Sequence, residues 1–468
     1  MTSMFDQINK IYKYFLLALR GKETEFTTGS INRAIFLLSV PMVLEMIMEA
    51  LFAVVDVYFV GKVSVDAVAT VGLTESVMMM VYAIGIGLSM AATAVVSRRI
   101  GEKKPKKAAD AAFQAIMVAV VFSIGISIVG IGYAEDILRL MGGSEKLIAN
   151  GHGYTKVMLG GNLCIMLLFL INAIYRGAGD ASMAMRSLWI ANGLNILLDP
   201  LFIFGLGPIP AFGVEGAAIA TTIGRSMGVF YQVFGLMSGR RIITLTIDNL
   251  KFKWRTLQRI VRIGAGGMGQ FLIESASWLL LVRIISEFGS AALAGYTIAF
   301  RIIVFTILPS WGMANAAATL VGQNLGAGKP DRAERSVWVT AHVNTVFLFS
   351  VSILFFIMAP EFVSIFSDDV VTGEYGALAL RIICVGYITF AYGMVISQGF
   401  NGAGDTKTPT LMNIVFFWLI QIPLAYLLAM EWDFGFSGAI VSVSIAFALH
   451  AVACVWLFKR GKWKDTRV

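Results

Sequence analysis

The chain has 468 residues, of which 57% are hydrophobic and only 14% are charged, and its mean hydropathy is +0.78. Soluble domains are close to half apolar and a quarter charged, so this composition excludes a protein built on one large soluble core. A net charge of +8 is also found in nucleic-acid-binding proteins, but the positions of the basic residues point to a different cause.

Twelve apolar stretches are long enough to cross the hydrocarbon core as helices, which takes about 20 residues each. In chain order the predicted spans are 33–60, 67–96, 109–132, 150–175, 183–206, 213–237, 257–286, 291–321, 335–359, 376–399, 409–430 and 435–458. The sequence therefore predicts an all-α polytopic membrane protein. Tyr14–Leu19, the apolar stretch before residue 30, is short and followed by charges, so we expect a surface-lying segment and no cleavable signal peptide.

Basic residues gather in alternate loops. Loop 98–107 carries six, loop 239–262 carries seven and the tail after Leu457 carries five, whereas 360–374 and 431–433 hold acidic residues without Lys or Arg. This alternation follows the positive-inside rule. It predicts a multi-pass protein of the cell membrane with both termini in the cytoplasm, and it explains the net charge without a nucleic-acid partner.

The sequence repeats itself at one fixed offset, which pairs Gly101 with Gly326. RIGEKKPKKA at 99–108 aligns with NLGAGKPDRA at 324–333, and YRGAGD at 175–180 aligns with FNGAGD at 400–405 at the same offset. A duplicated six-helix half explains both matches, and because six is even, the halves are related by a pseudo-two-fold axis along the membrane normal. The expected parts are an N-terminal interfacial segment 1–30, an N-lobe 31–238, a cytoplasmic linker 239–255, a C-lobe 256–459 and a tail 460–468.

Charged residues in the first span indicate a hydrated face. An ionisable group at mid-bilayer costs about 2.5 kcal/mol or more, so such groups persist where they meet a cavity or a partner. At about 100° per residue, Glu45, Glu49 and Asp56 fall within about 40° of one another on the helix. We expect this stripe to face a wet cavity, although Asp56 alternatively lies near enough to the outer end to reach interfacial water.

The fifth span contains NILLDPLFI at 195–203, which places an Asp in a segment whose other residues are mostly apolar and typical of a membrane-spanning helix. Asn192, Asn195 and Asp199 lie at i, i+3 and i+7, so they form a polar stripe on one helix face. Asp-Pro is also a frequent helix start, and the alternative is that the span breaks at Pro200 with Asp199 as its cap. The cap alone does not explain the stripe.

Glu274 lies near the middle of the seventh span, at the repeat position of Glu49. Arg301 lies at a similar depth in the eighth span, so a buried ion pair between these helices is one interpretation and cargo binding by Glu274 is the other. GAGGMG at 264–269 matches a dinucleotide motif, but no strand precedes it. These glycines are expected to let helices approach closely or bend.

These features together resemble the multidrug and toxic compound extrusion (MATE) family, over about residues 31–459. The resemblance rests on the two six-helix halves, the Asp of the first helix, the N-x-x-x-D pair of the fifth and the G-A-G-D loops after the fourth and tenth spans. The first half looks like the DinF-like branch. The second half departs from the NorM-like branch, because 376–399 contains no carboxylate to join Glu274, so no second-half sodium site is expected.

The resemblance implies roles for specific residues. Asp56 and Asp199 correspond to the coupling carboxylates, and Pro41 to the proline at which the first helix is proposed to bend. The polar residues that complete the coupling cluster are Asn195, Asn172, Tyr154 and Thr221. Two adjacent carboxylates cannot both stay ionised cheaply, so the pair is expected either to take up a proton or to share Na⁺ with Asn195, Asn172 and Thr221.

The function implied is a secondary active antiporter that exports amphiphilic, cationic organic compounds in exchange for H⁺ or Na⁺. It needs no resident cofactor and is expected to act as a monomer in the bilayer. The residues expected to line the substrate cavity are Glu45, Glu49, Glu274 and Asn192. A lipid-linked oligosaccharide flippase is the alternative within the same superfamily, although such proteins often have a strongly cationic cavity.

An integral membrane enzyme is the alternative from another class. His152, His342 and His450 are scattered along the chain, and the sequence contains neither a DDxxD nor an HExxH motif. The three cysteines lie inside apolar runs without metal-ligand spacing, so we expect them to be buried apolar residues. No enzymatic activity is expected.

Overall fold

A computed structural model describes residues 4–21 and 25–468 of the chain. Within this part, eight helices are long and apolar enough to cross a membrane, and two bent helix pairs raise the number of candidate spans to ten. Two further long helices, α9 (Val214–Met237) and α10 (Trp254–Ile285), pack among the candidate spans and complete the twelve. The expected all-α fold of twelve helices in two lobes is confirmed.

The N-lobe follows a preceding helix, α1 (Met4–Arg20), which packs against the start of the lobe. Arg186 of the lobe donates a hydrogen bond to the carbonyl oxygen of Leu19 in α1 at 2.6 Å. The N-lobe helices are α2 (Ile31–Gly61), α3 (Val65–Gly101), α4 (Pro105–Gly132), the short α5 (Ala134–Leu140), α6 (Glu145–Gly160), α7 (Asn162–Gly177), α8 (Ala181–Phe204) and α9.

The C-lobe begins with α10. Its other helices are α11 (Ser290–Gly326), α12 (Pro330–Ile357), the short α13 (Ala359–Ser364), α14 (Val370–Val385), α15 (Tyr387–Ala403), the continuous helix Lys407–Glu431 and α18 (Gly435–Lys459). In the helix Lys407–Glu431, the α-helical parts α16 (Lys407–Asn413) and α17 (Ile422–Tyr426) alternate with two π-helical stretches.

The duplication seen in the sequence is also visible in the helix boundaries. Helices α3 and α11, and likewise α4 and α12, begin and end at positions separated by the same offset as the sequence repeat. The fourth and tenth spans are each broken and bent, by 40° next to Gly161 and by 56° at Gly386, and these two glycines are also repeat partners. The two lobes are therefore similar in backbone geometry as well as in sequence.

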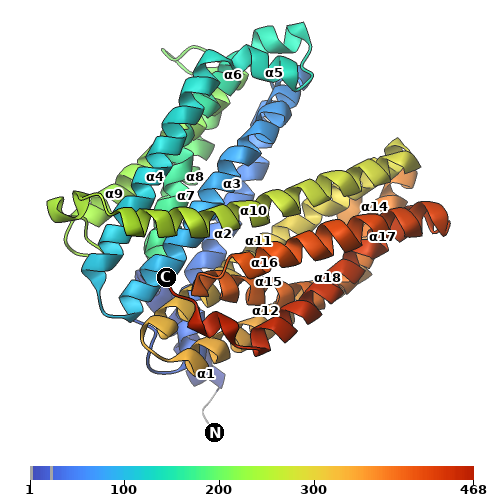
Figure 1. The fold of residues 1–468 in the computed structure, drawn as a ribbon. Helices are drawn as coiled ribbons and strands as arrows, with labels where there is room; N and C mark the ends of the chain where they lie inside the picture. The colour runs from blue at the N-terminus through green and yellow to red at the C-terminus, as the bar shows by residue number, and fades with distance from the viewer. Residues whose placement is uncertain (1–3, 22–24) are drawn as a thin grey trace.

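The lobes cross closely where α3 meets α10. A Cβ atom on Gly87 of α3 would run into the carbonyl oxygen of Gly264, and one on Gly267 would meet Gly87 and the sulfur of Met90. Residues without a side chain let the two backbones touch here, as expected for the motif 264–269. Figure 1 shows α10 passing across α3, with the two lobes diverging from this region.

Hydrogen bonds join the lobes at the end that carries both termini (Figure 1). Arg98 of α3 donates to the carbonyl oxygen of Thr466 at 2.5 Å, and Arg99 donates to that of Val468 at 2.9 Å. A Cβ atom on Gly326 of α11 would run into the backbone of Arg98. The lobes are therefore closed against each other at the terminal end and spread apart at the opposite end.

We predict that Gly87→Leu destabilises this arrangement, because the new side chain would have to push the backbone of α10 away. Overpacking of this kind costs about 1–3 kcal/mol. The apparent melting temperature of the purified protein in detergent should fall. Gly125→Leu is the matched control, since a Cβ atom on Gly125 of α4 meets no other atom within 4 Å. Equal melting temperatures for the two variants would contradict the close crossing.

Candidate cargo and ion-coupling site

A hollow of about 440 Å³ lies between the lobes, lined by α2, α3, α6, α7 and α9 on one side and by α10, α11 and α15 on the other. A second hollow of about 470 Å³ is lined mostly by the C-lobe, with Met79, Ile86 and Met90 of α3 closing it on the N-lobe side. Met79, Phe271 and Trp311 line both hollows, so the two adjoin. A cargo that enters between the lobes can therefore contact side chains from both.

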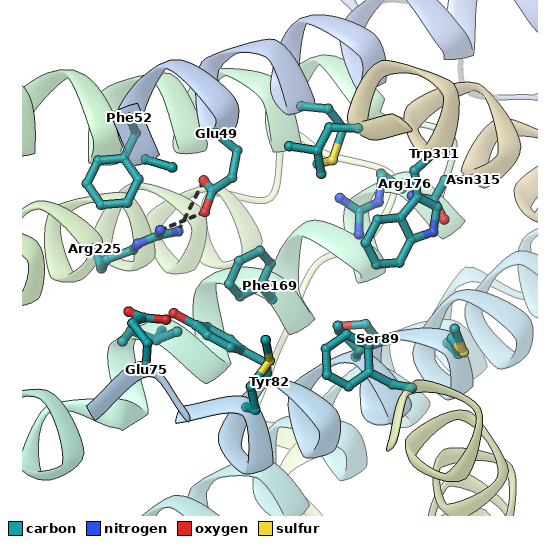
Figure 2. A pocket seen from close by; sticks show the side chains of 18 of the residues that line it. Glu49, Phe52, Glu75, Tyr82, Ser89, Phe169, Arg176, Arg225, Trp311 and Asn315 are labelled. Atoms are coloured by element: carbon teal, nitrogen blue, oxygen red, sulfur yellow. Dashed lines mark hydrogen bonds and ion pairs between the residues drawn. The ribbon is translucent and has the colours of Figure 1, made fainter. Parts of the chain in front are cut away.

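Three carboxylates line the first hollow: Glu49 and Asp56 of α2 and Glu75 of α3. Figure 2 shows Glu49 and Glu75 projecting from different helices, with Arg225 of α9 beside Glu49. Acidic groups therefore outnumber basic ones in this part of the wall. Such a wall attracts cations, because low-dielectric surroundings strengthen the field of the carboxylates.

Glu49 is held from two other helices. Arg225 donates to Oε1 of Glu49 at 2.7 Å through Nη2 and approaches Oε2 at 3.4 Å through Nη1. Asn192 of α8 also donates to Oε2, at 2.8 Å. Asn192 is itself buried and does not line the hollow, so in this structure it positions Glu49.

Glu45 does not reach the hollow that its helix stripe was expected to face. It is 1% exposed and forms an ion pair with Arg176 of α7, with Nη1 and Oε1 2.6 Å apart. Asn172 donates to the same oxygen at 2.9 Å, while its own carbonyl oxygen accepts from Ser187 and Gln232. Glu45 turns into the packed interior because Arg176 and Asn172 compensate its charge there.

Asn172 therefore lies in the Glu45 network, and the structure does not place it beside Asp199. Asp199 is fully buried in α8. Asn195, one turn earlier, donates from Nδ2 to Oδ2 of Asp199 at 2.9 Å when its own oxygen accepts from the Thr221 backbone N–H at 2.8 Å. Oδ1 of Asp199 has no hydrogen-bond partner. Asn195, Asp199 and Thr221 are thus brought together, as the resemblance implied.

The alternative that Asp199 caps a new helix is wrong. Helix α8 runs without a break from Ala181 to Phe204, with Pro200 inside it. A proline removes one backbone hydrogen bond from the helix, and neighbouring helices can support the backbone through such a position. Asp199 is therefore a carboxyl group inside the last third of a continuous helix, and its compensation comes from side chains.

Asp56 and Tyr154 complete the coupling residues implied by the family resemblance. Both line the hollow, Asp56 from α2 and Tyr154 from α6, and Thr221 of α9 lines it too. Asp56 lies close enough to Asp199 and to Tyr154 to act on each electrostatically. In the wall of the hollow, Thr221 donates to Asn195, which in turn donates to the buried Asp199.

Glu274 lines the second hollow, together with Gln270, Asn413 and His450. The ion pair considered above for Glu274 is absent from the described structure: Arg301 is exposed, and no ion pair joins it to Glu274. The two residues therefore face different surroundings. Glu274 is therefore available to a cargo in the hollow.

Pro41 lies inside α2, one turn before Glu45, and the helix is continuous through it. It is buried, and the next residue, Met42, lies so close to α11 that a Cβ atom on Gly312 would run into its carbonyl oxygen. The expected bending point is therefore packed against the C-lobe. A change of helix geometry at Pro41 would therefore displace the part of α11 that packs against it.

Three residues of the hollow wall, Glu75, Arg176 and Arg225, were not expected from the sequence. Glu75 and Arg225 each lie inside a predicted span, so the rule that charges in apolar runs mark cavities applies to both. Arg176 directly follows the predicted span 150–175, so that rule does not apply to it. The three cysteines are all buried and free, as expected.

Comparisons with known proteins agree with this geometry. The family model MatE matches residues 41–201 and 268–427, one stretch in each lobe. The chain is 26% identical to the probable multidrug resistance protein NorM of Thermotoga maritima over 94% of each chain, and 23% identical to the FAD transporter of Shewanella oneidensis over 92% of this chain and 95% of that one.

A solved structure extends the likeness to three dimensions. The outward-facing conformation of a multidrug resistance MATE family transporter of the MOP superfamily superimposes with a TM-score of 0.88 at 26% identity, covering 96% of this chain and 98% of that one. The matches include both lobes and most of the length. The chain therefore belongs to the MatE family and is a polytopic membrane transporter, not an enzyme.

Proposed function

We propose that this protein is a secondary active antiporter that exports amphiphilic organic cations in exchange for protons. The observation that carries the proposal is Asp199, fully buried with one oxygen lacking a partner, and linked through Asn195 to Thr221 in the wall of the hollow that Asp56 also lines. Asp199 and Asp56 interact electrostatically, so the ionisation of one carboxyl group opposes that of the other. Binding a proton at this pair removes negative charge from the cavity.

The surroundings of Asp199 support a proton as the coupling ion. Sodium prefers several oxygen ligands, and Asn172, one of the ligands expected from the resemblance, is engaged with Glu45 and Gln232. A buried carboxylate needs several hydrogen-bond donors, whereas a neutral carboxyl group needs fewer. Asp199 receives one such bond, from Asn195. A protonated state is therefore easier to accommodate than a Na⁺ ion held by the full set of ligands considered above.

Alternating access follows from the arrangement of the lobes. With both termini in the cytoplasm, as the basic loops indicate, the closed end lies inside the cell and the lobes open outward (Figure 1). Neutralising Asp56 and Asp199 would change the forces on α2 and α8. Because Pro41 already removes a backbone hydrogen bond from α2, bending there costs little, and the contact of Met42 with α11 transmits the change to the C-lobe.

The choice of cationic cargo rests on the charges in the wall. Arg176 and Arg225 are each ion-paired to a carboxylate, which leaves Asp56 and Glu75 without a hydrogen bond or ion pair among the described side chains. A second candidate cargo, a flavin nucleotide, comes from the relative named FAD transporter. The two arginines are the groups that would contact its phosphates, but both would first have to leave their carboxylates.

Removing either coupling carboxylate should abolish exchange. We predict that Asp56→Asn and Asp199→Asn each lower cargo transport by proteoliposomes under an imposed proton gradient by at least about tenfold, the equivalent of 1.4 kcal/mol. Asp136→Asn on the exposed helix α5 is the control and should keep wild-type transport. Wild-type rates in both cavity variants would rule out this coupling site.

The identity of the ion can be tested without a mutation. In proteoliposomes of the wild-type protein, an inward proton gradient at equal sodium on both sides should drive cargo exchange. An inward sodium gradient at equal pH should leave transport at the level measured without a gradient. If sodium alone drives exchange and the proton gradient does not, the carboxyl pair is a cation site and the proposed proton coupling is wrong.

A further inference from the structure

One wall of the first hollow contains a positively charged side chain of the protein itself, Arg225. The guanidinium carbon of Arg225 lies 5.1 Å from the ring centre of Phe52 and 5.4 Å from that of Phe169. Its nitrogens bind the carboxylate of Glu49. A carboxylate combined with aromatic rings is the chemistry that recognises organic cations. We call Glu49, Phe52 and Phe169 the cage.

The cage opens on the hollow. Glu49, Phe52, Phe169 and Arg225 all line it, and Figure 2 shows Arg225 beside Glu49 with Phe169 toward the centre of the hollow. The Arg225 side chain is only 5% exposed, whereas Glu49 is 20% exposed. An incoming cation can therefore reach Glu49 while the guanidinium group still lies behind it.

Further acidic groups lie near the cage. Glu75 and Asp56 line the same hollow and act electrostatically on one another, and Arg225 acts on both. Tyr82 of α3 packs edge-on against Phe169, with ring centres 6.3 Å apart. If Arg225 left Glu49, it would therefore still have carboxylates of opposite charge nearby. Displacement from the cage does not require an unpaired buried cation.

The duplicated half shows that the fold does not require this arginine. Glu274 stands at the repeat position of Glu49, in a hollow lined by the rings of Trp278, Phe417 and Phe447. Trp278 and Phe447 have ring centres 6.5 Å apart, and Phe417 and Phe447 6.0 Å. Among the described residues no basic side chain forms an ion pair with Glu274. Arg225 is thus a feature of the N-lobe site itself.

We propose that Arg225 is a tethered counter-ion that occupies the binding subsite for the cationic head group of the cargo. The cargo takes its place on Glu49, between Phe52 and Phe169, while the guanidinium group moves toward Asp56 and Glu75. Because the cage accepts a planar guanidinium group, it suits amidinium and guanidinium head groups. The inference rests on the proposed export of organic cations. It adds that the cargo must displace the guanidinium group of Arg225 from Glu49.

If the tethered cation Arg225 competes with the cargo, removing it should raise the affinity for the cargo. In Arg225→Met the competitor is gone, so the purified full-length protein in detergent at pH 8 should bind the fluorescent bisamidine DAPI about tenfold more tightly than wild type, a difference of 1.4 kcal/mol. Arg225→Lys keeps a tethered cation but not the two-pronged contact with Glu49, so its gain in affinity should be smaller than that of Arg225→Met. Equal or weaker binding by Arg225→Met overturns the proposal, and weaker binding would indicate that Arg225 contacts the cargo directly.

Two further variants distinguish a change in the binding site from a loss of folding. The double variant Glu49→Gln/Arg225→Met removes both partners of the ion pair, so neither is left with its charge uncompensated by the other, and it should lose the gain in affinity. Phe52→Leu removes one ring of the cage and should weaken DAPI binding at least about threefold, the lower range of a cation–π contact. Phe305→Leu, at an exposed position of α11, is the matched control and should bind like wild type.

The failure of this inference can be told apart from failure of the proposed function. If wild-type protein that elutes as a single species binds no organic cation, export of cations is wrong as a whole. If wild type binds DAPI but Phe52→Leu and Arg225→Met leave the affinity unchanged, the cargo binds outside the cage. In that case cation export stands and the role of Arg225 as a competitor is wrong.

Discussion

Carboxylates inside an apolar bundle must be compensated, and this constraint organises the N-lobe. An uncompensated charge there costs several kcal/mol, so a buried carboxylate pairs with a cation, accepts hydrogen bonds or binds a proton. Glu45 uses Arg176 and Glu49 uses Arg225. Asp199 has a single amide donor, from Asn195. Of Glu45 and Asp199, the two fully buried carboxyl groups discussed above, Asp199 is thus the less compensated, and a bound proton would supply what the protein does not.

The same constraint links charge to shape. Helices α2, α7, α8 and α9 are joined by the ion pairs and hydrogen bonds of Glu45 and Glu49, so a change of charge on either carboxyl group alters the forces between helices. The lobes meet through bare backbone at Gly87 and through Arg98 and Arg99 at the terminal end. The contact of the Met42 backbone with Gly312 of α11 would carry a bend in α2 to the C-lobe.

The sequence predicted the helices and their duplication well, because hydrophobic length and an internal repeat can be read from the segments themselves. It placed Asp199 beside Asn195 and Thr221 through family resemblance. It did not place Glu45, since helical periodicity gives the face of a helix but not the partner that turns a side chain inward. Arg176 and Arg225 come from other helices, and only the fold brings them to Glu45 and Glu49. The unbroken helix at Pro200 likewise depends on packing.

The central claim is that a cationic cargo and protons exclude each other in one cavity. The most direct measurement is proton release when DAPI is added to the detergent-solubilised protein in weakly buffered solution near neutral pH, followed with a pH indicator. The account predicts that wild-type protein releases protons in proportion to the cargo bound and that Asp56→Asn/Asp199→Asn releases none. Cargo binding by wild type without proton release would contradict it.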